Sequence, residues 1–502
     1  MASYLLSLLG FGPRRSAPPI VPTDEVAPVH LFDDTATLQG STMMWTFRFD
    51  EVLDADKLGN SLSELFQMQG WRKLGGRLRR RPDGSTEIHI PCPFSEDRPP
   101  LYFTKAKFDV RMSEHPEASK LPSAPDGLKP TTFPSPRNHK SLGLGPGSPT
   151  CFDDYLYSDH PQFALHVVNF TDGTLVSINF NHLTSDLAGL MAIINAWQLV
   201  LAGRPEAVPP FKGLYEDSMA NLYKAHTTEK YVLADKQLSG WNLAAFGLRL
   251  VFDSWWNSPV DSRLLCVPKK TMDAVVQAAR DQLPQTMDSS NDGASPRFIS
   301  ENDIVVALAT KAAAQNSSPS RPITVLQAVD PRSRVKSVFD QDAAYVCNAP
   351  AAAFSFCSSQ EAVDKSISEL ALDGRKALQS QVTEGQMKAV AALVAKAMAD
   401  TGNPPVFGDR NSLLLVSSNW SKAAFLEKVD FGPAIVKSPE SNRPRGKPGH
   451  PVYYHCQSME SGLVTTRVVV IMGRDLEGNF WLLGDQPSHF WPALLAQLEK
   501  YA

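Results

Sequence analysis

The apolar residues near the start of the chain recur with the periods of strands and helices. Residues 42–49 (TMMWTFRF) are apolar and aromatic over the length of a strand and predict one. After them, Leu58, Leu62 and Leu65 recur at spacings of four and three, which predicts an amphipathic helix. Residues 75–91 then predict two short strands around a Pro-Asp-Gly turn. The chain therefore begins as mixed α and β structure.

A hairpin and a buried helix are the most regular features of the first half. Residues 162–170 and 174–182 predict two strands joined by an Asp-Gly turn. Because side chains alternate along a strand, the apolar side chains of the second strand share one face with His182. Residues 187–203 predict a buried helix directly after it. The earlier segment 117–150, rich in Pro, Gly and Ser, predicts a long surface loop.

The second half mixes helices and strands without regular alternation. Residues 204–262 are mixed and rich in Trp, and apolar helical patterns recur at 301–314, near 360–381 and 385–400, and at the C-terminus. Strands are predicted at 322–330, 412–418, 465–473 and 480–484. No glycine-rich phosphate-binding pattern opens a helix, so nucleotide-binding folds of that kind are not indicated.

Length and composition add a domain count. The chain has 502 residues, more than one hydrophobic core usually supports. We therefore predict an N-terminal domain over 1–225, a crossover over 226–262 and a C-terminal domain over 263–502. The net charge of −4 gives no sign of a nucleic-acid partner.

The cysteines and the apolar runs indicate the cellular compartment of the protein. Six scattered cysteines lack CxxC spacing, which predicts reduced thiols and no metal site. No run approaches the roughly 20 apolar residues of a membrane span, and the N-terminal apolar stretch precedes its arginines, the wrong order for a secretory signal. We expect a cytoplasmic monomer.

Two histidines have an aspartate four residues further on: His30 with Asp34, and His182 with Asp186. Histidine is the usual general base for a hydroxyl, because its pKa lies near neutrality. His182 stands where an apolar strand ends and an apolar helix begins, so its side chain can reach a cleft, and it is the candidate base. The alternative is a core histidine bonded to a backbone carbonyl, which is what we expect for His30.

Asp186 has two interpretations. It could orient the His182 ring, as the third member of a catalytic triad does, or hold the turn together by pairing with a distant arginine. Because His182 lies at a strand end and not in a helix, the four-residue spacing does not by itself bring the two side chains together. We favour the structural role.

Five segments resemble, in the same order, segments of the BAHD-type acyltransferase family, whose fold family includes chloramphenicol acetyltransferase and peptide-synthetase condensation domains. They are NHLTSDLAG with His182 and Asp186, SENDIVVAL at 300–308, VDPRSR at 329–334, YVCNAP at 345–350, and SSNW followed by VDFGPA, which ends at Ala434. Each segment alone is a weak signal, but five in order across nearly the whole length are specific. The resemblance is closest to the fungal specialised-metabolism branch.

The resemblance implies an α/β (α+β) fold of two similar chloramphenicol-acetyltransferase-like halves, each a mixed sheet with helices, with an active-site channel between them. It implies an acyltransferase that moves an acetyl or other short to medium acyl group from acyl-CoA, a co-substrate, to a hydroxyl or amine of a small specialised metabolite. No cofactor would be bound permanently. His182 would take the proton of the acceptor as it attacks the thioester carbonyl.

Further site residues follow from the matching positions. Ser418 and Trp420 match the family's Ser/Thr-x-Trp positions, which line the region of the tetrahedral oxyanion. The alternative for Trp420 is a packing role in the core. Asp430, Phe431 and Gly432 match the start of its DFGWG segment, which is mostly structural.

The VDPRSR segment at 329–334 of the resemblance supplies candidate partners for Asp186. We expect its carboxylate to pair with Arg332 or Arg334 across the floor of the site.

The chain departs from the family pattern in three places. Pro433 and Ala434 replace Trp and Gly of DFGWG, which puts the shape of that loop in doubt. Cys347 stands where glycine is usual. Asn181 stands where condensation domains carry a second histidine, which weakens the peptide-synthetase interpretation.

The loop after this segment carries Lys437, Arg443, Arg445 and Lys447 among Pro and Gly residues. Clustered cations beside a channel would suit the phosphates of acyl-CoA. The alternative is a solvated surface loop.

Other functions stay open on the same scaffold. The chain could catalyse condensation, cyclisation or hydrolysis of a thioester, or use a carrier-protein thioester, or be a non-catalytic binding protein, since fold alone does not fix function.

Overall fold

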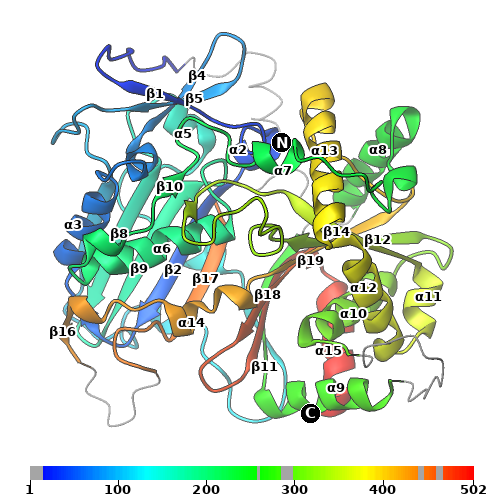
Figure 1. Cartoon of the computed structure of the whole chain (residues 1–502). Helices are drawn as coiled ribbons and strands as arrows, with labels where there is room; N and C mark the ends of the chain where they lie inside the picture. Colours follow the sequence, from blue (N-terminus) through cyan, green and yellow to red (C-terminus); the bar gives the residue numbers. More distant parts are fainter. Residues whose placement is uncertain (1–14, 257–259, 284–297, 439–445, 460–466) are drawn as a thin grey trace.

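The N-terminal half is built on a five-stranded mixed sheet (Figure 1). The computed structural model describes residues 15–256, 260–283, 298–438, 446–459 and 467–502. In spatial order the strands are β17 (Tyr453–Ser458), β2 (Thr42–Phe49), β9 (Gly173–Asn181), β8 (Phe163–Phe170) and β6 (Tyr102–Lys107). Only the β6–β8 pair of this sheet is parallel.

The C-terminal half is built on a seven-stranded mixed sheet. Its three central strands, β12, β15 and β18, run parallel, and the outer pairs are antiparallel. In spatial order the strands are β14 (Ala351–Ser358), β12 (Pro322–Val329), β15 (Leu413–Asn419), β18 (Val468–Arg474), β19 (Phe480–Pro487), β11 (Val260–Val267) and β7 (Thr131–Pro134).

Three smaller sheets complete the β structure. One is β1 (Glu25–Pro28), β5 (Thr86–Ile90) and β4 (Arg77–Arg80), and the two-stranded ones are β10 (Phe211–Lys212) with β13 (Ala344–Tyr345), and β16 (Ile435–Lys437) with β3 (Val52–Leu53). Both two-stranded sheets join segments from opposite halves of the sequence.

The α-helices cover the sheets. They are α2 (Ala36–Gln39), α3 (Ala55–Leu65), α4 (Lys140–Gly143), α5 (Phe152–Leu156), α6 (Leu187–Leu201), α7 (Ala220–Tyr223), α8 (Gly240–Trp256), α9 (Lys269–Asp281), α10 (Glu301–Ala314), α11 (Ser359–Asp364), α12 (Ile367–Gln381), α13 (Glu384–Thr401), α14 (Phe425–Lys428) and α15 (Phe490–Leu498). Among the described residues, no helix combines the length and apolar character needed to cross a bilayer.

The two large sheets exchange strands between the halves of the sequence. Strand β17, orange in Figure 1, lies at the edge of the N-terminal sheet beside β2. Strand β7 closes the far edge of the C-terminal sheet by pairing with β11. The boundaries 1–225, 226–262 and 263–502 stay a prediction, and both large sheets reach across them.

Local patterns located most elements correctly. The strand at 42–49 and the helix at 301–314 have the predicted bounds, and the hairpin and the helix after it form β8, β9 and α6. The prediction of a loop over 117–150 is partly wrong, because this segment contains β7 and α4. The helix near 360–381 is divided into α11 and α12, because Ser366 caps a new helix by accepting a bond from the backbone of Glu369.

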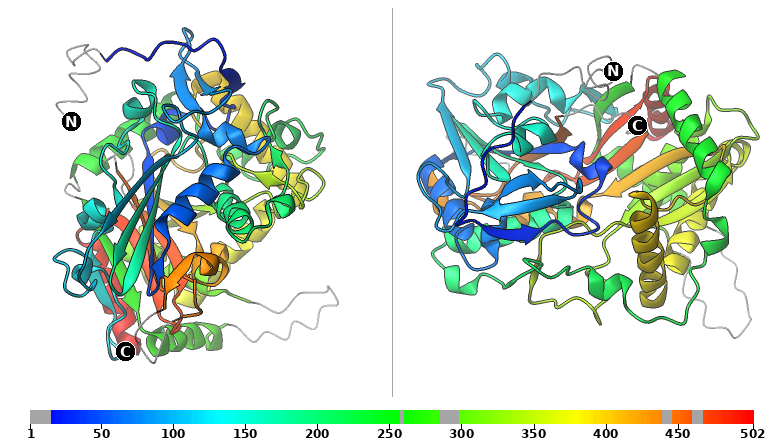
Figure 2. Two further views of the ribbon diagram at one scale, coloured as in Figure 1. Left: turned by 90° about the vertical axis from the view of Figure 1, so that its left-hand side faces the viewer. Right: turned by 90° about the horizontal axis from the view of Figure 1, so that it is seen from above.

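One hydrophobic core spans both halves. On the N-terminal sheet it contains Trp45 and Phe47, and on the C-terminal side it contains Trp420 and Phe425. The Trp45 and Trp420 rings lie 4.6 Å apart, and those of Phe47 and Phe425 5.3 Å apart. The two lobes seen in Figure 2 are therefore joined through apolar packing, which fixes the C-terminal segments against β2, the neighbour of the strand β9 that leads to His182.

Candidate active site

The turn between β9 and α6 positions His182. The backbone N–H of His182 donates to the carbonyl of Ser41, 2.7 Å away, just beyond the last paired residue of β9. The Asn181 side chain accepts a bond from the backbone of Leu183 at 3.1 Å and donates to Gln39. These bonds fix the backbone on both sides of the histidine.

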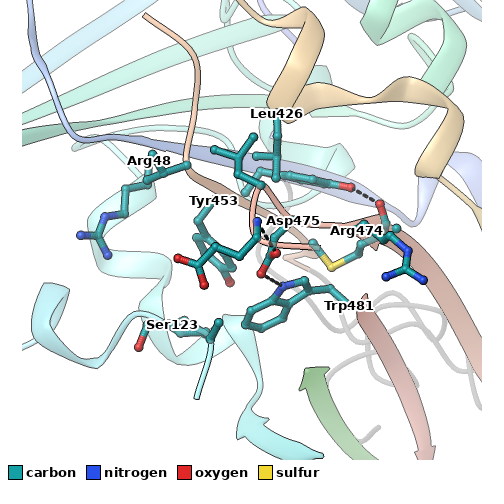
Figure 3. A pocket seen from close by; sticks show the side chains of 15 residues that line it. Arg48, Ser123, Leu426, Tyr453, Arg474, Asp475 and Trp481 are labelled. Atoms are coloured by element: carbon teal, nitrogen blue, oxygen red, sulfur yellow. Dashed lines mark hydrogen bonds between the residues drawn. The ribbon is translucent and has the colours of Figure 1, made fainter. Parts of the chain in front are cut away.

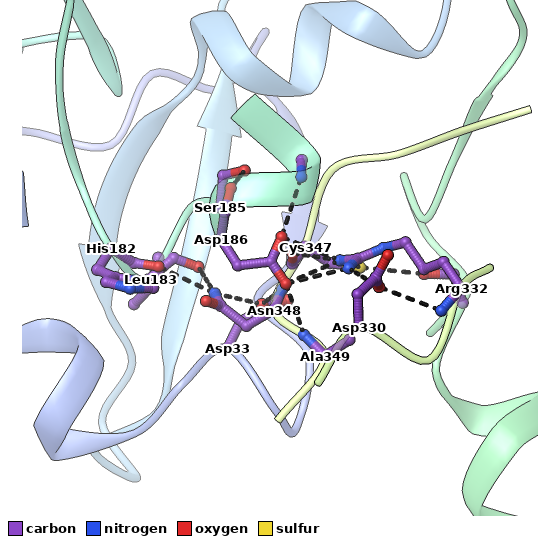
Figure 4. Close-up of polar contacts among 12 residues, drawn as sticks. Asp33, His182, Leu183, Ser185, Asp186, Asp330, Arg332, Cys347, Asn348 and Ala349 are labelled. Atoms are coloured by element: carbon purple, nitrogen blue, oxygen red, sulfur yellow. Dashed lines mark hydrogen bonds and ion pairs between the residues drawn. The ribbon is translucent and has the colours of Figure 1, made fainter. Parts of the chain in front are cut away.

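The imidazole of His182 is half-buried, and no carboxylate among the described residues bonds to it. Its Nδ1 atom is buried and has no hydrogen-bond partner among the described residues. Asp186 directs its carboxylate away from the ring (Figure 4). The site is therefore not a Ser-His-Asp type of triad, in which an acid holds the imidazole in one tautomer.

Asp186 connects the two halves of the protein. Its carboxylate caps α6 by accepting from the backbone N–H of Gly189 at 2.9 Å. It also accepts from the Arg332 guanidinium, with N–O distances of 3.1 and 3.2 Å, and from the backbone of Ala349 at 3.1 Å. Of the two arginines considered from the sequence, Arg332 makes the ion pair, and among the described contacts of Asp186 none is with Arg334.

Gly189 allows the helix to approach the C-terminal segment. A Cβ atom built there would lie 2.2 Å from the Ser185 hydroxyl and 3.4 Å from the backbone nitrogen of Cys347. A larger residue would push α6 away from this segment and stretch the bonds of Asp186. The glycine of the NHLTSDLAG segment therefore has a packing role.

Arg332 is held as a buried cation. Burial alone would lower its pKa, but the charge of Asp186 and further nearby groups raise it well above the usual value. Its Nη2 also donates to the carbonyl of Cys347 at 2.8 Å. Burial raises the pKa of the Cys347 thiol to about 11, so this cysteine is a neutral packing residue at ordinary pH.

Asn348 and Asp33 form a second link that the sequence did not reveal. The Asn348 side chain donates to the carbonyls of His182 at 2.9 Å and Leu183 at 3.3 Å. The Asp33 carboxylate accepts from both the backbone and the side-chain nitrogens of Asn348, at 2.6 and 2.9 Å. The backbone carbonyl of the candidate base is thus fixed by a residue 166 positions away. Asn348 lies in the YVCNAP segment of the resemblance, which assigned it no role, and no local pattern marked Asp33.

Asp33 lies in an environment that disfavours its charge. It is buried, and burial raises its pKa to about 7, although Lys73 and Asn348 act in the opposite direction. Burial likewise lowers the pKa of Lys73, whose amino group donates to the carbonyl of Gly213 at 2.5 Å.

This raised pKa predicts a stability that depends on pH. Because folded Asp33 keeps its proton up to about pH 7 and the unfolded residue loses it near pH 4, the free energy of unfolding should fall as pH rises through this window. Between pH 5 and 8 we expect a fall of about 2–3 kcal/mol from this group. Urea unfolding of Asp33→Asn, which keeps the acceptor oxygen, should lack this component. An equal slope in both proteins would contradict it.

Ser418 and Trp420 lie together at the end of β15. The Trp420 indole donates to the Ser418 hydroxyl at 2.9 Å. Because that hydroxyl accepts this bond, its own proton is left to donate elsewhere. The Trp420 ring packs on Trp45, which pairs across the sheet with Ile178, four residues before His182. Four residues of a β-strand extend about 13 Å, so Trp420 packs at a point of the sheet that is about 13 Å along β9 from His182.

The segment that begins at Asp430 attaches to the N-terminal half. The Phe431 ring is buried, 5.4 Å from that of Phe49 and 4.5 Å from that of Trp197. The Asp430 carboxylate accepts from the backbone of Gly432 at 2.8 Å. Strand β16 then pairs with β3. Through these contacts, this C-terminal segment packs on the N-terminal half of the protein.

A pocket lies where the two sheets meet (Figure 3). Its volume is about 760 Å³, including space open to solvent, and its walls include Arg48 and Tyr453 from the N-terminal sheet and Arg474 and Trp481 from the C-terminal sheet. Arg474 is already paired with Glu301 at 2.7 Å.

The described end of the predicted basic loop, at Gly446, borders this pocket. A Cβ built on Gly446 would lie 2.8 Å from Leu476 and 3.8 Å from Val452, and both of these residues line the pocket. The neighbouring Lys447 is exposed, and Lys437 is exposed and donates to the carbonyl of Thr171 at 3.1 Å. Arg443 and Arg445 lie outside the described residues.

His30, which has the same spacing to an acid, has a different environment. Its ring lies 3.2 Å from the carbonyl of Gly213, and burial lowers its pKa. The Asp34 carboxylate accepts from the backbone N–H and the hydroxyl of Thr86, and its described contacts do not include the His30 ring. His30 is a core histidine bonded to a backbone carbonyl.

Comparison with known proteins identifies the family. The model of the Transferase family matches residues 44–215. The chain is 32% identical over 489 residues to "O-acetyltransferase PaAT-2" of Phomopsis amygdali, covering 96% of this chain and 99% of that protein. It is 33% identical over 503 residues to "Transcriptional regulator calD" of Penicillium decumbens, covering 98% and 99%.

A solved structure shares the fold. The crystal structure of F. sporotrichioides TRI101 complexed with coenzyme A and T-2 matches with a TM-score of 0.61 at 16% identity, over 95% of this chain and 98% of that one. The chain belongs to the BAHD-type acyltransferase family, among fungal members. It is an acyltransferase.

Proposed function

We propose that the protein transfers an acyl group from acyl-CoA to a hydroxyl of a small specialised metabolite, with His182 as the general base. One observation carries the proposal: the His182 backbone is bonded to Ser41 and to Asn348 from distant segments, while its ring makes no hydrogen bond among the described residues. Because Nδ1 is buried, Nε2 is the ring nitrogen left for proton transfer with a substrate. The 32% identical relative is named as an O-acetyltransferase, which favours a hydroxyl acceptor.

The reaction would follow direct transfer. His182 removes the hydroxyl proton as the acceptor oxygen attacks the thioester carbonyl, and the tetrahedral oxyanion collapses to the ester. The leaving thiolate takes the proton back from His182. The Ser418 hydroxyl accepts a bond from Trp420 and so keeps its own proton free. It would donate a hydrogen bond to the oxyanion and stabilise the transition state by roughly 3–4 kcal/mol.

The pocket between the sheets would hold coenzyme A. It is large enough for an extended thiol arm, and the exposed loop residue Lys447 lies at its border. Arg474 at the pocket is paired with Glu301 and Asp273, which leaves the phosphates to the loop cations. TRI101 was solved with coenzyme A, which supports a CoA thioester as donor.

The test of the function is release of free thiol from acetyl-CoA with and without alcohols and amines. We expect release that requires an alcohol. Release without any acceptor would instead identify a thioester hydrolase. Tight binding of acetyl-CoA without release of thiol for any acceptor would favour a non-catalytic binding protein. One relative is named as a transcriptional regulator, which is the reason for including this alternative in the test.

The loop cations should control the affinity for the donor. Changing Arg443, Arg445 and Lys447 together to Gln should raise the KM for acyl-CoA by about tenfold or more and weaken its dependence on salt, while leaving kcat nearly unchanged, because phosphates bind through charge. Steady-state kinetics at two salt concentrations measures both effects.

A matched control removes the same charge elsewhere. Lys129, Lys230 and Lys396 are exposed side chains outside this loop, and their replacement by Gln should leave the KM unchanged. If both triple variants have the KM of the unmodified protein, the loop has no role in donor binding.

A further inference from the structure

Helix α8 exposes a row of large apolar side chains to solvent. The exposed fractions are 71% for Trp241, 66% for Leu248, 64% for Trp255 and 70% for Trp256. Val251 and Phe252 are also exposed. In the view of Figure 1 the helix lies at the outer edge of the molecule.

The inner side of the helix is mostly apolar and is anchored by one ion pair. Phe246 is buried there, and Leu243 and Leu250 are partly buried on the same side. Asp253, also buried on this side, pairs with Arg321. Helix α8 is therefore apolar on both sides, and its outer side is left exposed.

The outward face is continuous and uncharged. At 100° per residue, the exposed apolar side chains of α8 span an arc of about 140° that also contains two alanines and no charged residue. Exposed apolar faces of this size on soluble proteins mark contacts with other proteins or with membranes.

The chemistry of the face fits a lipid surface. Tryptophans stand at both ends of the helix, and among the described residues the indole N–H groups of Trp241, Trp255 and Trp256 have no hydrogen-bond partner. Indoles prefer the boundary between hydrocarbon and headgroups, where the ring is buried and the N–H stays hydrated. Arg249 and Arg410 border the face on its Asn242 side, at the position where lipid phosphates would lie.

A protein partner fits the face less well. Stable protein interfaces carry a polar rim and about one hydrogen bond per 100–200 Å². Within the exposed arc of α8 the side-chain donors are indole N–H groups alone, and Arg249 and Arg410 lie on one border of it. A bilayer needs no matching groove, so a projecting helix can insert its side chains directly.

We propose that α8 is an interfacial membrane-binding helix that seats the protein on a phospholipid surface, with its axis in the plane of the headgroups. The helix lies on the bilayer and does not cross it. This proposal is independent of the acyl-transfer function, because α8 contributes no residue to the site around His182.

Flotation with phosphatidylcholine vesicles tests the proposal. The full chain should float with the vesicles, and the double variant Leu248→Glu/Trp255→Glu should bind at least about tenfold more weakly, since loss of about 1.4 kcal/mol of transfer free energy corresponds to that factor. The control Leu128→Glu/Val363→Glu adds the same charge at exposed apolar positions outside α8 and should float as the unmodified chain does.

Brominated phosphatidylcholine provides a second measurement. Its bromine atoms quench indoles that enter the bilayer, so the full chain should lose fluorescence on mixing and Trp241→Gln/Trp256→Gln should lose much less. Unmodified protein that stays in the lipid-free fraction overturns the proposal, as does a double Glu variant that floats equally well. A dimer in light scattering that the Leu248→Glu/Trp255→Glu change dissociates, without any vesicle binding, assigns the face to a second copy and also overturns it.

Discussion

His182→Ala should lower kcat for thiol release by roughly 10²- to 10⁴-fold, the usual contribution of general acid–base catalysis. Its ring has no partner among the described residues, so its removal breaks no described side-chain bond and the fold should remain intact. The KM for acyl-CoA should change little. Because no carboxylate holds the ring, the loss should come from the imidazole alone and not from a coupled triad.

His30→Ala is the matched control, because His30 has the same spacing to an aspartate. Its ring contacts a backbone carbonyl away from the site, so kcat should stay within a fewfold of the unmodified enzyme. Thermal melting of both variants separates lost chemistry from lost structure. Near-normal turnover by His182→Ala would remove this residue from the mechanism.

Asp186→Ala should cost roughly 3–5 kcal/mol of unfolding free energy, because it leaves the Arg332 guanidinium buried without its main partner. The Arg332 side chain is 11% exposed, so water can replace little of the lost contact. Activity should fall along with stability, since the same carboxylate anchors the turn that carries His182. Asp186→Asn keeps an oxygen for capping α6 and should isolate the ionic part of the loss.

Asp330→Asn is the matched control for that prediction. Asp330 also contacts Arg332, at 2.9 Å, but its side chain is 42% exposed, and exposed pairs contribute about 1 kcal/mol or less. Replacing both Asp186 and Arg332, by Ala and Met, should recover part of the stability lost in Asp186→Ala, because no charge is then left buried. Equal losses of unfolding free energy for Asp186→Ala and Asp330→Asn would show that the Asp186–Arg332 ion pair stabilises the protein no more than an exposed pair does.

The sequence located the centre of the site but not its support. Strand β9 and helix α6 were visible as local periodicity, and so was the position of His182 between them. The resemblance to the BAHD family offered Arg332 or Arg334 as the partner of Asp186, and the tertiary structure shows the ion pair with Arg332. Asp33 and Asn348, 315 positions apart, gave no local signal, because a buried hydrogen bond between distant segments leaves no periodic pattern.

What the sequence determined by itself was local: β2, the hairpin of β8 and β9, and helices α3, α6 and α10 follow from the spacing of apolar side chains, which depends only on near neighbours. The tertiary structure alone decided the exchange of β7 and β17 between the sheets, because edge pairing depends on which distant backbone has unpaired groups within reach. It also decided which side of α8 is exposed. The sequence segment is apolar around most of the helix, and the side that faces the protein is set by burial of Phe246 and by the bond of Asp253 to Arg321 from another part of the chain.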